Sequence, residues 1–185
     1  MRIISGIFKG KKIILPDDKN TRPLKDLTKE SVFNIIKHSN KFDIQLENSS
    51  ILDLFSGVGS FGIECLSRQV KFVTFIENYS KALKILEQNL NNLKIKNYEI
   101  LNFDIINSFN EIKFDKKYNI IFLDPPYKEK NINKILNNIF NKKILINGGL
   151  IIIHRNKKED EKFSEILKVL DIKEYGISKI IFGTL

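Results

Sequence analysis

The chain has very little cysteine and histidine, two residue types on which several protein classes depend. It contains one cysteine, Cys65, and two histidines among 185 residues. A single cysteine cannot form a disulfide within the chain or build a cysteine-based metal site. His38 and His154 stand isolated in the sequence, so a structural role is predicted for both. We therefore expect neither a disulfide framework nor a bound metal.

The chain also lacks a long apolar run. The longest candidate, ILINGGLIII at 144–153, is interrupted by Asn147 and two glycines, whereas a membrane-spanning helix needs about 20 apolar residues. The first residues, MRIISGIFKGKK, contain no apolar stretch of signal-peptide length. We therefore expect no membrane association and a cytoplasmic location.

Acidic residues are outnumbered by basic ones, 22 against 31, which gives a net charge of +9. Such an excess favours a polyanionic partner, although solvated lysines of a lysine-rich chain would give the same total. Basic residues are dense in the N-terminal segment, where they are interleaved with few acids: Arg2, Lys9, Lys11, Lys12, Lys19, Arg22, Lys25 and Lys29. This clustering favours nucleic acid as the partner.

The length and the 42% hydrophobic content predict one domain, residues 1–185, with three parts. Two β-rich runs, 2–8 and 11–15, are separated by Lys9-Gly10 and predict a small basic β-hairpin; with the loop after it, this hairpin makes up residues 1–24. An apolar stripe over 25–38 predicts a helix, and a polar connector extends to residue 49. Residues 50–185 form the third part.

This third part alternates predicted strands with predicted helices. The strands are 50–55, 71–77, 98–103, 118–124 and 149–154, and the helices are 60–69, 80–94, 105–112 and 130–143. Near-continuous apolar strands joined by helices indicate an α/β fold with a parallel sheet covered on both faces. A further helix near 159–169 and an antiparallel hairpin around Gly176 complete a Rossmann-like, mostly parallel sheet.

A glycine loop follows the first of these strands. Gly57, Gly59 and Gly62 form a G-x-G-x-x-G between a strand and a helix, where glycines permit a tight turn and close approach of a nucleoside-bearing ligand. Glu77 ends the next strand, where an acid can accept hydrogen bonds from ribose hydroxyls. Asp104 ends the third strand and would either contact an adenine amino group or cap the following helix.

Two cofactor classes fit this loop, a nicotinamide dinucleotide and S-adenosylmethionine. In a dinucleotide fold the pyrophosphate sits on the helix N-terminus, and a carboxylate just before the loop would oppose it. Asp53 is such a carboxylate. S-adenosylmethionine carries no phosphate and has a cationic sulfonium and amine, so Asp53 favours this methyl donor.

The fourth strand ends in the tetrad Asp124-Pro125-Pro126-Tyr127. Neither proline can donate a backbone hydrogen bond, so the strand must stop at Asp124. In an open parallel sheet this tetrad and the glycine loop face one crevice. Hydrogen bonds from an exocyclic amine to the Asp124 carboxylate and the Pro125 carbonyl would localise the nitrogen lone pair, and the Tyr127 ring would stack on the base. The tetrad thus predicts methylation of an unpaired or flipped base.

Both motifs resemble those of class I S-adenosylmethionine-dependent methyltransferases. The stretches MRIISGIFKGKKIILP, TRPLKD and ESVFNII extend the likeness over the whole chain; they resemble bacterial 16S ribosomal RNA guanine-N2 methyltransferases of the RsmD type. This resemblance implies methylation of a guanine of ribosomal RNA or of the small ribosomal subunit. We also expect a monomer.

The resemblance also implies roles for particular residues. It places Asp124, Pro125, Pro126 and Tyr127 at the reacting amine, and it places the cofactor against Asp53, Ser56, Gly57, Gly59, Glu77, Asp104 and Arg22. Thr21, Arg22 and Pro23 would border cofactor and substrate, and Arg2, Lys9, Lys11, Lys12 and Arg22 would bind RNA. Three other functions compete: an adenine-N6 methyltransferase acting on DNA or RNA, an NAD-dependent oxidoreductase, and a non-catalytic RNA-binding module.

Overall fold

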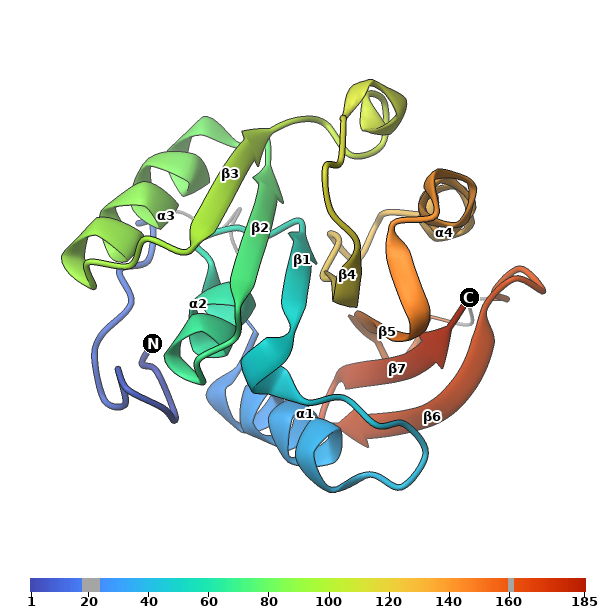
Figure 1. Ribbon diagram of the computed structural model, residues 1–185, viewed down its shortest axis with the longest axis horizontal. Helices are drawn as coiled ribbons and strands as arrows, with labels where there is room; N and C mark the ends of the chain where they lie inside the picture. Colours follow the sequence, from blue (N-terminus) through green and yellow to red (C-terminus); the bar gives the residue numbers. More distant parts are fainter. Residues whose placement is uncertain (18–23, 160–161) are drawn as a thin grey trace.

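A computed structural model describes residues 1–17, 24–159 and 162–185, and these residues form one seven-stranded sheet flanked by helices (Figure 1). The strands are β1 (Ser50–Leu54), β2 (Phe72–Glu77), β3 (Tyr98–Asn102), β4 (Tyr118–Leu123), β5 (Leu145–Asn156), β6 (Lys168–Tyr175) and β7 (Ser178–Thr184). The helices are α1 (Asp26–His38), α2 (Ser60–Ser67), α3 (Ser80–Asn92) and α4 (Ile132–Lys142), with short 3₁₀ turns η1 (Leu46–Asn48) and η2 (Phe109–Glu111). Within these ranges no helix is long and apolar enough to cross a membrane.

The sheet has the order β3-β2-β1-β4-β5-β7-β6. Neighbours among β1 to β5 are parallel, and β7 runs antiparallel to both β5 and β6. The predicted α/β class, with a mostly parallel sheet and a C-terminal antiparallel hairpin, is confirmed. Because β1 and β4 are central and adjacent, the loops that follow them leave the same edge of the sheet.

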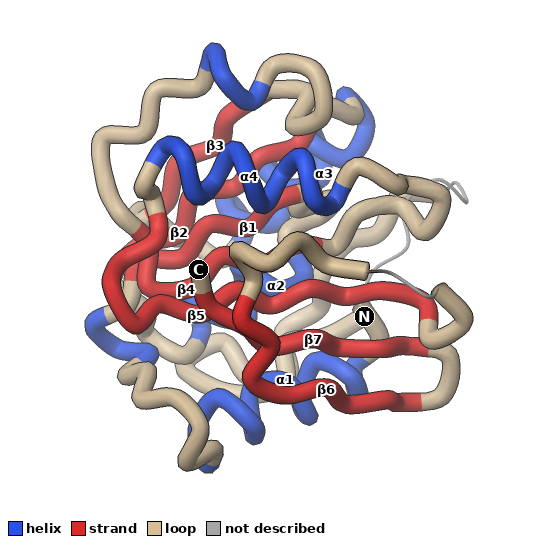
Figure 2. The backbone as a smooth tube through the Cα atoms, turned by 90° about the vertical axis from the view of Figure 1, so that its right-hand side faces the viewer, coloured by secondary structure: helices blue, strands red, loops and turns tan. Residues whose placement is uncertain are grey.

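Alternate residues of the central strands enter two cores, one on each face of the sheet. Ile51 and Phe122 face a core shared with α1, α2 and α3. Leu52 and Leu123 face a second core shared with α4. Figure 2 shows α4 on the near face of the sheet. The continuous apolar strands predicted from sequence are therefore buried on both sides.

Two predicted helices are wrong. The segment predicted as a helix at 105–112 contains only η2, because the Asp104 carboxylate accepts the N–H groups of Ile106 and Asn107 at 2.9 and 3.1 Å and closes a turn instead. The helix predicted near 159–169 does not exist over its described residues. There the chain runs into β6, whose first residues, Lys168 and Val169, pair with β7.

The predicted N-terminal hairpin is reduced to an isolated antiparallel bridge between Arg2 and Lys12. Its two arms are joined by backbone bonds, from the N–H of Ile3 to Lys11 and from the N–H of Ile13 to Met1, and the first arm also bonds to α2. The Glu64 carboxylate accepts the N–H groups of Ile4 and Ser5 at 2.8 and 3.0 Å, and Ser67 accepts bonds from the next turn. A further difference is the length of β5, which begins four residues before the predicted strand at 149–154 and continues two residues past it.

Candidate active site

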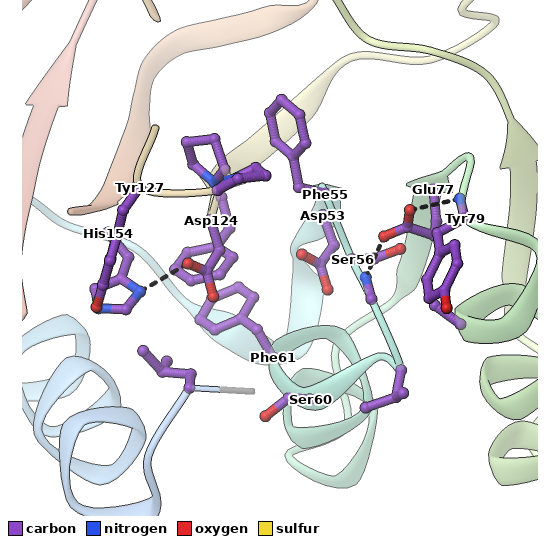
Figure 3. A pocket seen from close by; sticks show the side chains of 17 residues that line it. Asp53, Phe55, Ser56, Ser60, Phe61, Glu77, Tyr79, Asp124, Tyr127 and His154 are labelled. Atoms are coloured by element: carbon purple, nitrogen blue, oxygen red, sulfur yellow. Dashed lines mark hydrogen bonds and ion pairs between the residues drawn. The ribbon is translucent and has the colours of Figure 1, made fainter. Parts of the chain in front are cut away.

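A cavity of about 510 Å³ lies where β1, β2, β4 and β5 end (Figure 3). Many of the predicted site residues line it, namely Asp53, Ser56, Gly57, Glu77, Asp124, Pro125, Pro126 and Tyr127. Gly59 lies beside it as the residue before α2, whereas Asp104 is not among the lining residues. The predicted contact Arg22 lies outside the described residues, as do Thr21 and Pro23.

The glycines of the loop after β1 have separate structural causes. Gly59 has a φ of 85°, and a Cβ there would lie 2.5 Å from a methyl group of Leu86. A Cβ on Gly62 would lie 2.2 Å from the ring of Phe75, so α2 can approach the sheet only with glycine at this position. Gly57 has a φ of 54° and turns its N–H toward β2. The motif therefore sets both the turn and the helix packing.

Glu77 ties the ends of β1 and β2 together. Its Oε2 accepts the N–H of Gly57 at 2.8 Å, and its Oε1 accepts the N–H groups of Asn78 and Tyr79 at 2.9 Å. The carboxylate is therefore held in one orientation beside the glycine loop. Each oxygen of a carboxylate has two lone pairs, so Oε2, which accepts one N–H, can still accept a bond from a ligand hydroxyl.

Asp53 is almost fully buried in the cavity floor, and its Oδ2 accepts the N–H of Gly62 at 2.9 Å. Burial raises the pKa of Asp53 well above its ordinary value, and the nearby charges of Asp124 and Glu77 raise it further. The described residues that line the cavity thus include three carboxylates, without a lysine or arginine. This arrangement suits a cationic ligand and opposes a pyrophosphate.

Asp124 forms a hydrogen bond with a histidine that the sequence reasoning placed in a structural role. Nδ1 of His154 lies 2.7 Å from Oδ1 of Asp124 (Figure 3). Its Nε2 lies 2.9 Å from the Ser178 hydroxyl. The Tyr127 ring meets the imidazole edge-on, with centroids 5.9 Å apart. His154 lines the cavity, whereas His38 is exposed on α1. No local motif predicted this contact of His154, because Asp124 lies 30 positions earlier in the sequence.

Arg155 supports the tetrad from the other face of β5, and sequence reasoning missed it as well. Its guanidinium is buried and donates to the carbonyls of Pro126 at 3.2 Å and Glu129 at 2.7 Å, with a further bond to Tyr127. A basic residue closing the apolar run IIIHR was the available signal. Prolines cannot donate backbone bonds, so this side chain supplies bonds that hold the loop.

The predicted RNA-binding side chains lie on the segment that docks on α2. Arg2, Lys9, Lys11 and Lys12 are exposed. Lys29, which belongs to the same basic cluster in the sequence, is fully buried with its Nζ 3.8 Å from Glu64. Burial lowers the pKa of Lys29, and the charge of Glu64 partly opposes this shift. Lys29 therefore anchors the segment and is unavailable to a partner.

The strand order, with β7 inserted antiparallel between β5 and β6, is the fold of class I methyltransferases. The Escherichia coli protein yhhF shares it with a TM-score of 0.84 at 24% identity, over 99% of this chain and 96% of that chain. SMU.776, a provisionally assigned methyltransferase complexed with SAH, shares it with a TM-score of 0.63 at 16% identity, over 86% of this chain and 50% of that one.

A family model described as "Conserved hypothetical protein 95" matches residues 1–184. Ribosomal RNA small subunit methyltransferase D of Buchnera aphidicola subsp. Acyrthosiphon pisum is 35% identical over 157 residues, which cover 85% of this chain and 78% of the relative. The chain therefore belongs to the family of this relative, the RsmD family. The resemblance to this family that the sequence indicated is confirmed.

Proposed function

We propose that the protein transfers a methyl group from S-adenosylmethionine to the exocyclic N2 amine of a guanine in small-subunit ribosomal RNA. One observation carries the chemistry: the Asp124 tetrad and the acid-lined glycine loop open onto one cavity. Relatives named ribosomal RNA small subunit methyltransferase D support the RNA substrate. The choice of guanine N2 rests on the family resemblance.

S-adenosylmethionine, the cofactor of this methyl transfer, fits the residues of the cavity. Asp53 is a buried carboxylate whose charge a cationic donor would compensate, and the neighbouring loop at Ser56 and Gly57 leaves room for a nucleoside. Glu77 would accept hydrogen bonds from the ribose. Asp104 and Arg22 remain further predicted contacts, although the Asp104 carboxylate already accepts bonds from its own turn. When bound, the cofactor supplies an electrophilic methyl group.

The tetrad would hold the base. The Asp124 carboxylate and the Pro125 carbonyl accept the two N–H groups of the amine; the charge-assisted bond to Asp124 contributes about 1.5–3 kcal/mol and the neutral bond to Pro125 about 0.5–1.5 kcal/mol. The Tyr127 ring stacks on the base and contributes about 1–3 kcal/mol. Pro126, whose carbonyl Arg155 holds, stiffens the turn. Positioning of the nitrogen against the methyl group then provides most of the rate enhancement.

The test is methylation of small ribosomal subunits that lack the modification, with isotope-labelled S-adenosylmethionine and mass spectrometry of the nucleosides. We expect labelled N2-methylguanosine, and Asp124→Ala should abolish it while calorimetry shows unchanged binding of S-adenosylhomocysteine. N6-methyladenosine would instead identify an adenine-N6 methyltransferase, which could use the same tetrad. Binding of NAD in place of S-adenosylmethionine, or RNA binding without any transfer, would overturn the proposal.

A further inference from the structure

We infer that His154 is a positioning residue for Asp124 in methyl transfer, an inference that rests on the proposed function. The side chain is 6% exposed and lies at the wall of the cavity, between the end of β4 and the start of β7. Its two ring nitrogens have separate partners, Asp124 at 2.7 Å and Ser178 at 2.9 Å. The ring orientation is therefore fixed at both ends.

These partners determine which nitrogen carries the proton. An ionised carboxylate can only accept, so Nδ1 of His154 must donate to Oδ1 of Asp124. In the neutral ring Nε2 is then an acceptor, and the Ser178 hydroxyl donates to it. Ser178 pairs with Asn156 in the β5–β7 register, which sets the hydroxyl beside the ring. The three side chains form one chain of bonds that ends at the carboxylate.

Because of the hydrogen bond from His154, the two carboxylate oxygens of Asp124 differ in their partners. Oδ1 is occupied, and Oδ2 of Asp124 has no hydrogen bond to any residue that the structure describes. Oδ2 is thus the oxygen left for the substrate amine. Without the imidazole, the carboxylate could rotate about its Cβ–Cγ bond and the amine would lose its fixed acceptor. His154 also contacts the Tyr127 ring, so it supports both groups that would hold the base.

In the transfer step, Asp124 receives the proton that the substrate nitrogen loses. The nitrogen lone pair forms the bond to the methyl carbon, and the electron pair of the broken carbon–sulfur bond goes to sulfur. The nitrogen then carries a positive charge and two hydrogens, and one of these passes to Oδ2 as a proton. Nδ1–H of His154 stays bonded to Oδ1 throughout, so the acid that forms keeps its orientation.

The kinetic test replaces His154 by Phe, which keeps the ring but has no donor, and by Asn, whose amide nitrogen can take the place of Nδ1. We expect His154→Phe to lower kcat for RNA methylation by about 100-fold, with calorimetric affinity for S-adenosylhomocysteine unchanged. His154→Asn should recover at least about tenfold of that loss. His38→Phe, on the exposed face of α1, is the matched control and should retain full activity.

A second measurement does not depend on turnover. With two histidines in the chain, nitrogen-15 spectra of the imidazoles resolve the tautomer of each ring. His154 should carry its proton on Nδ1, and Asp124→Ala should remove that preference. A proton on Nε2 in the wild-type protein would overturn the inference, as would His154→Phe with a wild-type kcat. If the wild-type protein methylates no RNA at all, the proposed function fails, while the tautomer result still stands or falls separately.

Discussion

The backbone N–H of Gly57 donates a 2.8 Å hydrogen bond to Oε2 of Glu77, joining the loop after β1 to the end of β2. The same carboxylate also accepts the N–H groups of Asn78 and Tyr79. Glu77 therefore orders the wall of the cavity before any ligand enters. A carboxylate used in this way shapes the cavity and leaves one lone pair, on Oε2, for a ligand.

Replacing Glu77 should weaken cofactor binding in a graded way. Glu77→Ala removes the acceptor of three backbone N–H groups, and we expect the Kd for S-adenosylhomocysteine to rise at least about tenfold, since bonds to charged groups contribute about 1.5–3 kcal/mol. Glu77→Gln keeps one acceptor oxygen and should lose less. Calorimetry measures both, with the exposed Glu87→Ala on α3 as control. If Glu77→Ala bound S-adenosylhomocysteine as tightly as wild type, Glu77 would not contribute to cofactor binding.

Asp53 should make stability depend on pH. Burial raises the pKa of Asp53 above its unfolded value near 3.8, so the folded protein holds this proton more tightly than the unfolded chain. The free energy of unfolding therefore falls as pH rises from the pKa of Asp53 in the unfolded chain through its pKa in the folded protein. Asp53→Asn avoids this loss and keeps an oxygen for the N–H of Gly62.

Urea unfolding at a series of pH values measures the effect. Asp53→Asn should be more stable than wild type at neutral pH, and the difference should vanish below the unfolded value. The same variant should bind S-adenosylmethionine more weakly, because the carboxylate that compensates the cation is gone. Asp43→Asn, at an exposed position, serves as the control. A pH-independent difference between Asp53→Asn and wild type would contradict the linkage.

The sequence predicted those parts of the fold and site in which local patterns and final contacts agree. Apolar runs predicted the central strands, and the glycines that set the turn before α2 were visible as a motif. The helix predicted at 105–112 failed because the Asp104 side chain competes for backbone N–H groups, and the one near 159–169 failed because β7 pairs with Lys168 and Val169. The intrinsic secondary-structure propensity of a segment does not depend on such hydrogen-bond partners, so it could not predict either outcome.

The site shows the same division. Asp124 to Tyr127 could be predicted as a group that lines the cavity, because the motif consists of four consecutive residues. The contact of His154 with Asp124 could not be predicted, since it arises from a sheet that brings β5 beside β4 after 30 residues. Its isolation in the sequence suggested a structural role, yet the fold supplies it with two partners. Arg155 was missed for the same reason, because its acceptors are carbonyls that belong to no side-chain motif.

Arg155 leads to a prediction about the tetrad. Arg155→Met keeps much of the buried volume but leaves the carbonyls of Pro126 and Glu129 without this donor. We expect a loss of about 2–4 kcal/mol in the free energy of unfolding, together with a lower kcat because the loop that carries Tyr127 loses its support. Arg155→Lys keeps a donor, so its free energy of unfolding and its kcat should lie between those of Arg155→Met and wild type.

Urea unfolding and single-turnover methylation measure these effects on the same preparations. Lys130→Met, at an exposed position after the same loop, is the control for removing a positive charge nearby. A lower stability with an unchanged methylation rate would show that Arg155 supports the core and leaves the tetrad in place.

The exposed lysines of the N-terminal segment should determine how RNA binding depends on salt. Each phosphate contact releases counterions, so removal of Lys9, Lys11 and Lys12 lowers the slope of log K against log salt by up to about 0.7 per lost contact with single-stranded RNA. The triple alanine variant should therefore bind more weakly at low salt and show a flatter slope, by up to about 2 in total. Fluorescence anisotropy with an RNA fragment over a salt series measures both quantities.

A matched variant distinguishes the effect of where the lysines lie from the effect of the net charge of the protein. Lys96, Lys113 and Lys117 are also exposed, but they precede β3 and β4 and so lie at the sheet edge opposite the cavity. Replacing all three with alanine removes the same charge, and long-range attraction weakens equally, whereas direct phosphate contacts are kept. The slope should then stay near the wild-type value. Equal slopes for the two triple variants would mean that the N-terminal segment acts through net charge and makes no specific contact with RNA.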